Sequence, residues 1–173
     1  DLYDVDYQYG APEPSDPHLA RALAELRPHS ESKGWFAIHV LYSECRCSQR
    51  IFDHLFDDPR PEGVDESIVL VGPDAELERR ARAAGFDLHL VTPRELETRF
   101  HIVSAPLFIV LDQDDSVRYA GGYTARKQAL DIQDTSVLVA LQAGAAAEGL
   151  PLFGCGVSRE LQDLIDPLGL KYD

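Results

Sequence analysis

Residues 36–48 read FAIHVLYSECRCS and join an apolar run directly to a pair of cysteines. The run Trp35–Tyr42 is rich in β-branched and aromatic residues, which predicts a buried strand. The stretch Ser48–Phe56 that follows carries its apolar residues on one side, which predicts an amphipathic helix. Cys45 and Cys47 are therefore expected at the turn between a buried strand and a helix.

A turn of this kind favours cysteine chemistry. The N-terminus of a helix offers unpaired N–H groups and a partial positive charge, and both stabilise a thiolate. Arg46 and Arg50 would add positive charge, whereas Glu44 would oppose them. A cysteine whose pKa is lowered in this way is a nucleophile at neutral pH. The sequence thus predicts a reactive thiol here.

The rest of the chain alternates between predicted strands and helices. Further strands are expected over Ser67–Val71, Asp87–Val91, Leu107–Leu111 and Ser116–Ala120. Further helices are expected over His18–Leu26, Ala75–Ala84, Arg94–Phe100, from a cap at Thr124 to about Ala143, and over Ser158–Ile165. Alternation of this kind, followed by a hairpin, predicts a mixed sheet with helices on both faces.

Three stretches together resemble the thioredoxin-like superfamily. Residues 36–48 resemble its active-site strand and turn, residues 103–110 its cis-proline loop, and residues 117–122 its last strand with a glycine bulge. The overall pattern is most similar to tethered thioredoxin-like proteins of the bacterial periplasm. The resemblance implies an α/β fold with a mixed central sheet flanked by helices. We expect an N-terminal arm over residues 1–34, a thioredoxin-like domain over 35–148, and a C-terminal helical extension over 149–173 that carries Cys155.

The active-site motif departs from the C-x-x-C of thioredoxins. By the apolar positions of the helix, Cys45 aligns with the attacking cysteine and Ser48 replaces the resolving one, while Cys47 is an extra thiol between them. A disulfide between Cys45 and Cys47 would close a tight, strained ring, and strained disulfides are oxidising. Cys155, expected in a flexible turn between two glycines, could resolve Cys45 instead, or it could be a buried free thiol.

The resemblance also implies roles for other residues. His39 takes the place of the buried acid beneath the attacking sulfur, and it could shuttle protons or be a hydrogen-bonded core histidine. The bond between Ala105 and Pro106 is expected to be cis, with the backbone of Ala105 pairing with a substrate peptide. Arg46 is expected to stabilise the thiolate and to contact the substrate.

The expected function is thiol–disulfide exchange by an oxidoreductase or an isomerase-type enzyme, in which Cys45 attacks and Cys47 or Cys155 resolves. The partner would be a protein or a small thiol in the periplasm or another extracytoplasmic compartment, and no cofactor is expected. The alternative is a metal-binding protein that holds Cu(I), zinc or an iron–sulfur cluster with Cys45, Cys47 and Cys155, joined by His39. A redox-inactive binding module and a peroxidase are further alternatives, although the peroxiredoxin pattern before Cys45 is missing.

Composition and charge narrow the function classes. A chain of 173 residues that is 45% hydrophobic suits one globular domain with its own core. The net charge of -14 argues against a nucleic-acid partner, because phosphate binding depends on clustered Lys and Arg. Three cysteines are too few for a disulfide scaffold. Because the chain has no methionine, we expect that a tag, signal peptide or membrane anchor once preceded Asp1.

Overall fold

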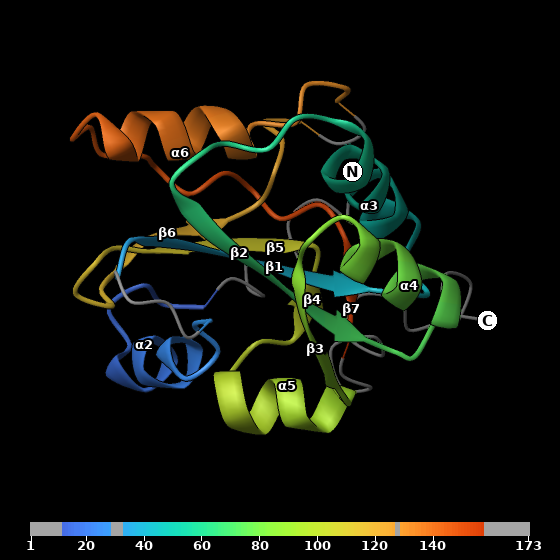
Figure 1. Ribbon diagram of the computed structural model, residues 1–173. Coiled ribbons are helices and arrows are strands. Elements are labelled where there is room, and N and C mark those ends of the chain that lie inside the picture. The colour runs from blue at the N-terminus through green and yellow to red at the C-terminus, as the bar shows by residue number, and fades with distance from the viewer. Residues whose placement is uncertain (1–11, 29–32, 127–128, 158–173) are drawn as a thin grey trace.

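A computed structural model describes residues 12–28, 33–126 and 129–157. Its centre is a five-stranded sheet in the order β3-β2-β1-β5-β6 (Figure 1). The strands are β1 (Trp35–Tyr42), β2 (Val64–Val71), β3 (Asp87–Val91), β5 (Leu107–Leu111) and β6 (Val117–Gly121). The β1–β2 and β2–β3 pairs are parallel, and the β1–β5 and β5–β6 pairs are antiparallel. The expected mixed sheet is therefore confirmed.

Helices cover both faces of this sheet (Figure 1). One face carries α3 (Arg46–Asp57), α4 (Ala75–Ala83) and α6 (Asp134–Gln142), and the other carries α2 (Pro17–Ala24) and α5 (Pro93–Phe100). Because successive strand side chains point to opposite faces, β1 contributes to both apolar clusters and is buried on both sides. Within the described ranges, no helix has the length and apolarity needed to cross a bilayer.

The helix expected near the start of the chain packs into the core. Asp16 caps α2 by accepting a hydrogen bond from the His18 backbone N–H at 2.9 Å. Leu19 and Leu23 on its inner side are fully buried and belong to the same cluster as Phe100 of α5. The described part of the expected N-terminal arm therefore contributes to the packing of one sheet face.

The expected cap at Thr124 is wrong. The helix in question, α6, begins at Asp134 after Gln133, and the Thr124 hydroxyl donates to the Arg126 carbonyl at 2.9 Å, which is a local turn contact. The Gln133 N–H donates to the Tyr123 carbonyl at 2.8 Å and closes the connection as a loop. The helix expected over Ser158–Ile165 lies outside the described residues.

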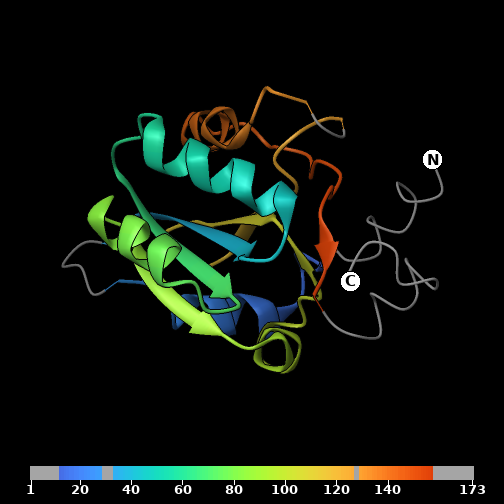
Figure 2. The same cartoon turned by 90° about the vertical axis from the view of Figure 1, so that its right-hand side faces the viewer.

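A second, two-stranded sheet was not predicted from the sequence. It joins β4 (Ser104–Ala105) to β7 (Cys155–Gly156) in antiparallel register, so that Ala105 pairs with Cys155 and Ser104 with Gly156. The expectation of a flexible turn around Cys155 is therefore wrong, because this segment is a strand held by backbone pairing. Figure 2 shows β7, drawn in red, running past the end of α3 that follows β1.

Candidate active site

Cys45 lies at the junction of β1 and α3, as the sequence predicts. It is the N-cap residue of α3, with an extended backbone at φ -102° and ψ 121°. Its side chain is fully buried, and its Sγ donates to the carbonyl of Ala105 at a distance of 3.8 Å. The peptide bond between Ala105 and Pro106 is cis, and both residues are buried. The strand–helix turn and the proline loop thus meet at this sulfur.

All three cysteines gather at this point, although Cys155 is far from the other two in sequence. The thiols of Cys155 and Cys47 both lie close enough to the Cys45 sulfur to lower its pKa through side-chain hydrogen bonding. Cys155 is brought there by β7, because it pairs with Ala105, whose carbonyl also accepts from Cys45. Each of the three carries a thiol rather than a disulfide. The sequence-predicted candidates Cys45, Cys47, Cys155 and Ala105 therefore form one cluster.

The pKa values of Cys45 and Cys155 are shifted in opposite directions. Hydrogen bonds from the thiols of Cys155 and then Cys47 lower the pKa of Cys45 well below its usual range, against the opposing effect of burial. The backbone N–H groups of Ser48 and Cys47 lower it further. The hydrogen bond to Cys45, burial, and the nearby negative charge raise the pKa of Cys155. Cys45 is therefore the first thiolate to form, while Cys155 keeps its proton and donates it.

Ser48, at the position where the resemblance would place a resolving cysteine, has a structural role. Its side chain is fully buried, and its hydroxyl oxygen accepts a hydrogen bond from the Tyr42 backbone N–H at 3.0 Å. This bond ties the end of β1 to the first turn of α3 and holds the turn that carries Cys45. Ser48 itself has no thiol, so Cys47 and Cys155 stay the two candidates expected from the sequence.

Tyr42 is a residue of the site that sequence reasoning missed. Its hydroxyl donates to Glu44 at 2.6 Å. Burial, and then the hydrogen bond to Glu44 and its negative charge, raise the pKa of Tyr42 to about 12. The hydroxyl thus keeps its proton and donates a hydrogen bond to the Glu44 carboxylate. Its position at the end of β1 was the available signal. Arg46, by contrast, is exposed at the first position of α3.

His39 lies inside the core on the same face of β1 as Leu41, as strand alternation predicts. The ring is fully buried and stacks on Phe108 at 5.2 Å between centroids. Its Nδ1 lies 2.7 Å from the Tyr123 hydroxyl, and its Nε2 donates to the Glu66 carboxylate at 2.9 Å. Both nitrogens are thus engaged away from the cysteines, and a proton-shuttle role stays a prediction.

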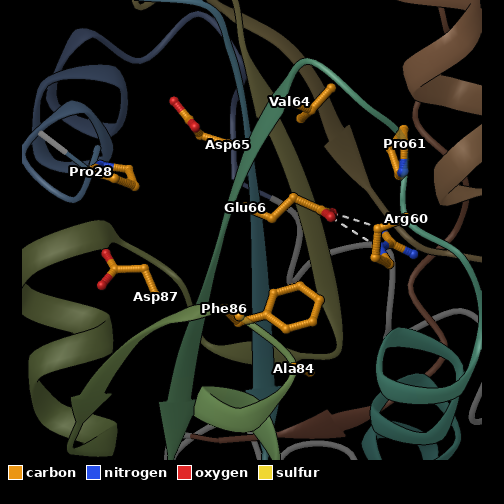
Figure 3. Close-up of a pocket in the computed structure, with 10 residues that line it drawn as sticks. Pro28, Arg60, Pro61, Val64, Asp65, Glu66, Ala84, Phe86 and Asp87 are labelled. Carbon is orange, nitrogen blue, oxygen red and sulfur yellow. Dashed lines mark hydrogen bonds and ion pairs between the residues drawn. The ribbon is translucent and has the colours of Figure 1, made fainter. Parts of the chain in front are cut away.

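The hydrogen bond from His39 leads to Glu66, which lines a surface hollow of about 390 Å³ (Figure 3). Arg60 and Glu66 point toward one another there, and Arg60 also contacts the buried Asp134 at 2.8 Å. Burial alone would raise the pKa of Glu66, but hydrogen bonds from His39 and Arg60 lower it to about 2. The hollow lies at the start of β2, at the opposite end of the strands from Cys45. Its charged residues therefore stabilise the fold away from the thiol cluster.

The described residues give the metal alternative no ligand set. Within residues 12–28, 33–126 and 129–157, no group of three or more His, Cys, Asp or Glu side chains is arranged to hold a metal ion. His39, the fourth ligand considered from the sequence, bonds Tyr123 and Glu66 through its two ring nitrogens.

Comparisons with known proteins bear on the fold. No protein-family model and no curated protein matches the chain. An uncharacterized conserved protein from Geobacillus kaustophilus matches with a TM-score of 0.55 and 21% identity, over 74% of this chain and 78% of that one. A hypothetical protein from Sinorhizobium meliloti matches with a TM-score of 0.55 and 18% identity, over 78% of this chain and 82% of that one. The thioredoxin domain of a thiol-disulfide oxidoreductase from Bacteroides vulgatus also matches, with a TM-score of 0.39 and 10% identity, over 55% of this chain and 71% of that one. The two matches with a TM-score of 0.55 support the fold alone, and the mixed five-stranded sheet with helices on both faces is the α/β architecture that the resemblance implied.

Proposed function

We propose that the protein is a thiol–disulfide oxidoreductase in which Cys45 attacks and Cys155 resolves. The observation that carries this proposal is that both cysteines meet at Ala105: Cys155 pairs with its backbone, and the Cys45 sulfur donates to its carbonyl at 3.8 Å. The lowered pKa of Cys45 supplies the nucleophile, and the proton held on Cys155 keeps that thiol inactive until Cys45 has reacted.

The exchange takes place in two steps. The Cys45 thiolate attacks a disulfide R–S–S–R′, so that a Cys45–S–S–R bond forms while R′–S⁻ leaves and takes a proton from solvent. Cys45 is then neutral, and the negative charge and hydrogen bond that raised the pKa of Cys155 are gone. Cys155 therefore loses its proton to the leaving R–S⁻ as its sulfur attacks Cys45. The two protein thiols are oxidised to one disulfide, and the substrate is reduced to two thiols.

Cys47 serves best as a donor to the thiolate. Its thiol lowers the pKa of Cys45, but a disulfide between Cys45 and Cys47 would span only one intervening residue and would be strained. Cys155 lies across a strand pair and meets Cys45 without closing such a ring. The same exchange run in reverse would oxidise a substrate dithiol.

The substrate we propose is a protein or small-molecule disulfide. The backbone of Ala105 beside the cis bond to Pro106 would orient it, and the exposed Arg46 would contribute positive charge at the rim. A chain with this chemistry suits an extracytoplasmic compartment such as the bacterial periplasm, where disulfides persist.

Disulfide mapping tests this function. The fully reduced protein is treated with one equivalent of a small disulfide, and the product is digested and mapped by mass spectrometry. We expect a Cys45–Cys155 disulfide with Cys47 still a thiol. A Cys45–Cys47 disulfide would show that the resolving cysteine is misassigned. Stoichiometric metal in anaerobically purified protein, lost in Cys45→Ser, would replace the exchange function with a metal site.

A further inference from the structure

The segment that carries Cys155 pairs with the strand whose Ala105 carbonyl accepts from the Cys45 sulfur. Leu150 accepts a hydrogen bond from the Gly122 N–H at 2.8 Å, and its own N–H donates to the Tyr119 hydroxyl at 3.1 Å. At its other end, Val157 donates to the Val103 carbonyl at 2.7 Å. Residues 150–157 thus lie along the end of β6 and then along β4. Cys45, whose sulfur donates to the Ala105 carbonyl, is fully buried.

The contact between this segment and the domain is made backbone to backbone. A Cβ added to Gly154 would lie 2.0 Å from the Ala105 carbonyl oxygen, and one added to Gly122 would lie 1.8 Å from the carbonyl oxygen of Pro151. No side chain fits either approach. Leu152 and Val157 are buried in the same apolar cluster as Ala105, which anchors the segment.

We propose that residues 150–157 are an occluding strand that must be displaced before an external polypeptide can exchange with Cys45. This inference rests on the proposed function. The edge of Ser104 and Ala105 has one set of backbone groups, and β7 already uses it. A second extended chain can pair there only after β7 leaves, because a strand edge accepts one partner.

The occluding strand also indicates which external chain fits. A partner in the same register places its cysteine opposite Ala105, where Cys155 now lies, and its preceding residue where Gly154 lies. The Ala105 oxygen leaves no room for a Cβ at that place. The preferred substrate is therefore an extended polypeptide disulfide with glycine immediately before its cysteine.

The test compares two glycine substitutions. Gly154→Ala forces β7 away from Ala105. Gly34→Ala is the matched control, because its Cβ would lie at an ordinary 3.7 Å from the Gly63 oxygen. The probe is a peptide with the sequence of residues 150–157, its cysteine carried as a mixed disulfide with thionitrobenzoate, whose release is coloured. Attack by the Cys45 thiolate forms a Cys45–peptide disulfide and expels thionitrobenzoate.

We expect Gly154→Ala to release thionitrobenzoate about tenfold faster than the unsubstituted protein, a change of about 1.4 kcal/mol. Gly34→Ala should behave like the unsubstituted protein. Rates are measured across pH, so that a change in the pKa of Cys45 is separated from a change in access. A rate in Gly154→Ala equal to or below that of the unsubstituted protein would overturn the proposal.

Two further measurements keep the result interpretable. Gly122→Ala loosens the same segment from its other side and should accelerate the reaction too. A second peptide probe carries alanine in place of the glycine before its cysteine. With Gly154→Ala or Gly122→Ala as the folded protein, this alanine probe should react more slowly than the glycine probe. Equal rates for the two probes in both variants would mean that unfolding, and not displacement, exposed Cys45, and that the proposal is wrong.

Failure of the occlusion and failure of the exchange function give different results. The mixed disulfide of cysteamine with thionitrobenzoate is a small probe with the same leaving group. If it converts the unsubstituted protein to the Cys45–Cys155 disulfide but neither glycine variant accelerates the peptide reaction, only the occluding strand is wrong. If no probe yields that disulfide in any folded variant, the proposed function itself fails.

Discussion

Cys155 pairs with Ala105 across β4 and β7, and the carbonyl of that same Ala105 lies 3.8 Å from the sulfur of Cys45. Ala105 therefore positions both thiols. Its carbonyl accepts from the Cys45 sulfur, and its backbone pairs with that of Cys155. This arrangement brings a cysteine from near the end of the chain to a helix N-terminus near its beginning.

The Cys155→Ser and Cys47→Ser variants separate the two candidate resolving thiols. With Cys155→Ser, we expect the mixed disulfide between Cys45 and the substrate to accumulate and turnover to stop, because nothing else resolves it. With Cys47→Ser, the Cys45–Cys155 disulfide should still form. Intact mass after reaction with a small disulfide distinguishes the two. Accumulation of the mixed disulfide in Cys47→Ser alone would reverse the assignment.

The pKa of Cys45 should depend on the donor at position 155. The Cys155 thiol gives the largest lowering of that pKa, so Cys155→Ala should raise it by at least about one unit, or about 1.4 kcal/mol. Cys155→Ser is the control, because a serine hydroxyl still donates to the thiolate and should retain much of the lowering. The thiolate absorbance in the ultraviolet, followed against pH, measures the shift. Equal pKa values of Cys45 in Cys155→Ala and Cys155→Ser would show that a hydrogen-bond donor at position 155 does not affect this pKa.

Glu66 should make stability depend on pH in the acid range. Its pKa is about 2 in the folded protein against an ordinary 4.5, so its ionised form stabilises the fold above about pH 4.5, and this stability is lost as the pH falls toward 2. Glu66→Gln should therefore lower the free energy of unfolding at neutral pH by about 3 kcal/mol. The deficit should shrink as the pH falls.

Glu76→Gln on α4 is the matched control for that substitution. Glu76 also bonds an arginine, Arg79, but both side chains are exposed, so its loss should not change stability measurably. Urea denaturation at neutral pH and at acid pH measures both variants. A deficit in Glu66→Gln that stays constant with pH would contradict the linkage.

His39→Phe tests the role of the buried histidine. Phenylalanine can keep the stack on Phe108, but it leaves the Tyr123 hydroxyl and the Glu66 carboxylate without their ring partners. We expect unfolding to become easier by about 2 kcal/mol, with the exchange rate of the folded protein unchanged. A slower exchange whose pH profile loses a step near neutrality would support the proton-shuttle role instead.

Secondary structure was predictable from the sequence where the hydrophobic pattern was continuous. Residues 35–42 form a strand with the expected bounds because an unbroken apolar, β-branched run suits a strand buried on both faces. The expectation failed at Thr124, because its side chain bonds within a loop that the Tyr123–Gln133 hydrogen bond closes. A capping residue in sequence does not reveal whether its hydroxyl will meet a helix or a turn.

The sequence by itself determined the strand, the helix after it and the place of Cys45 between them, because periodicity acts over a few residues. Only the tertiary structure decided the partner of that cysteine. The position of Cys155 depends on backbone pairing with Ala105 and on the absence of a Cβ at Gly154, and these contacts join residues distant in sequence. The local sequence pattern does not predict such a contact, because the contact forms only when the folded sheet brings the two backbones together.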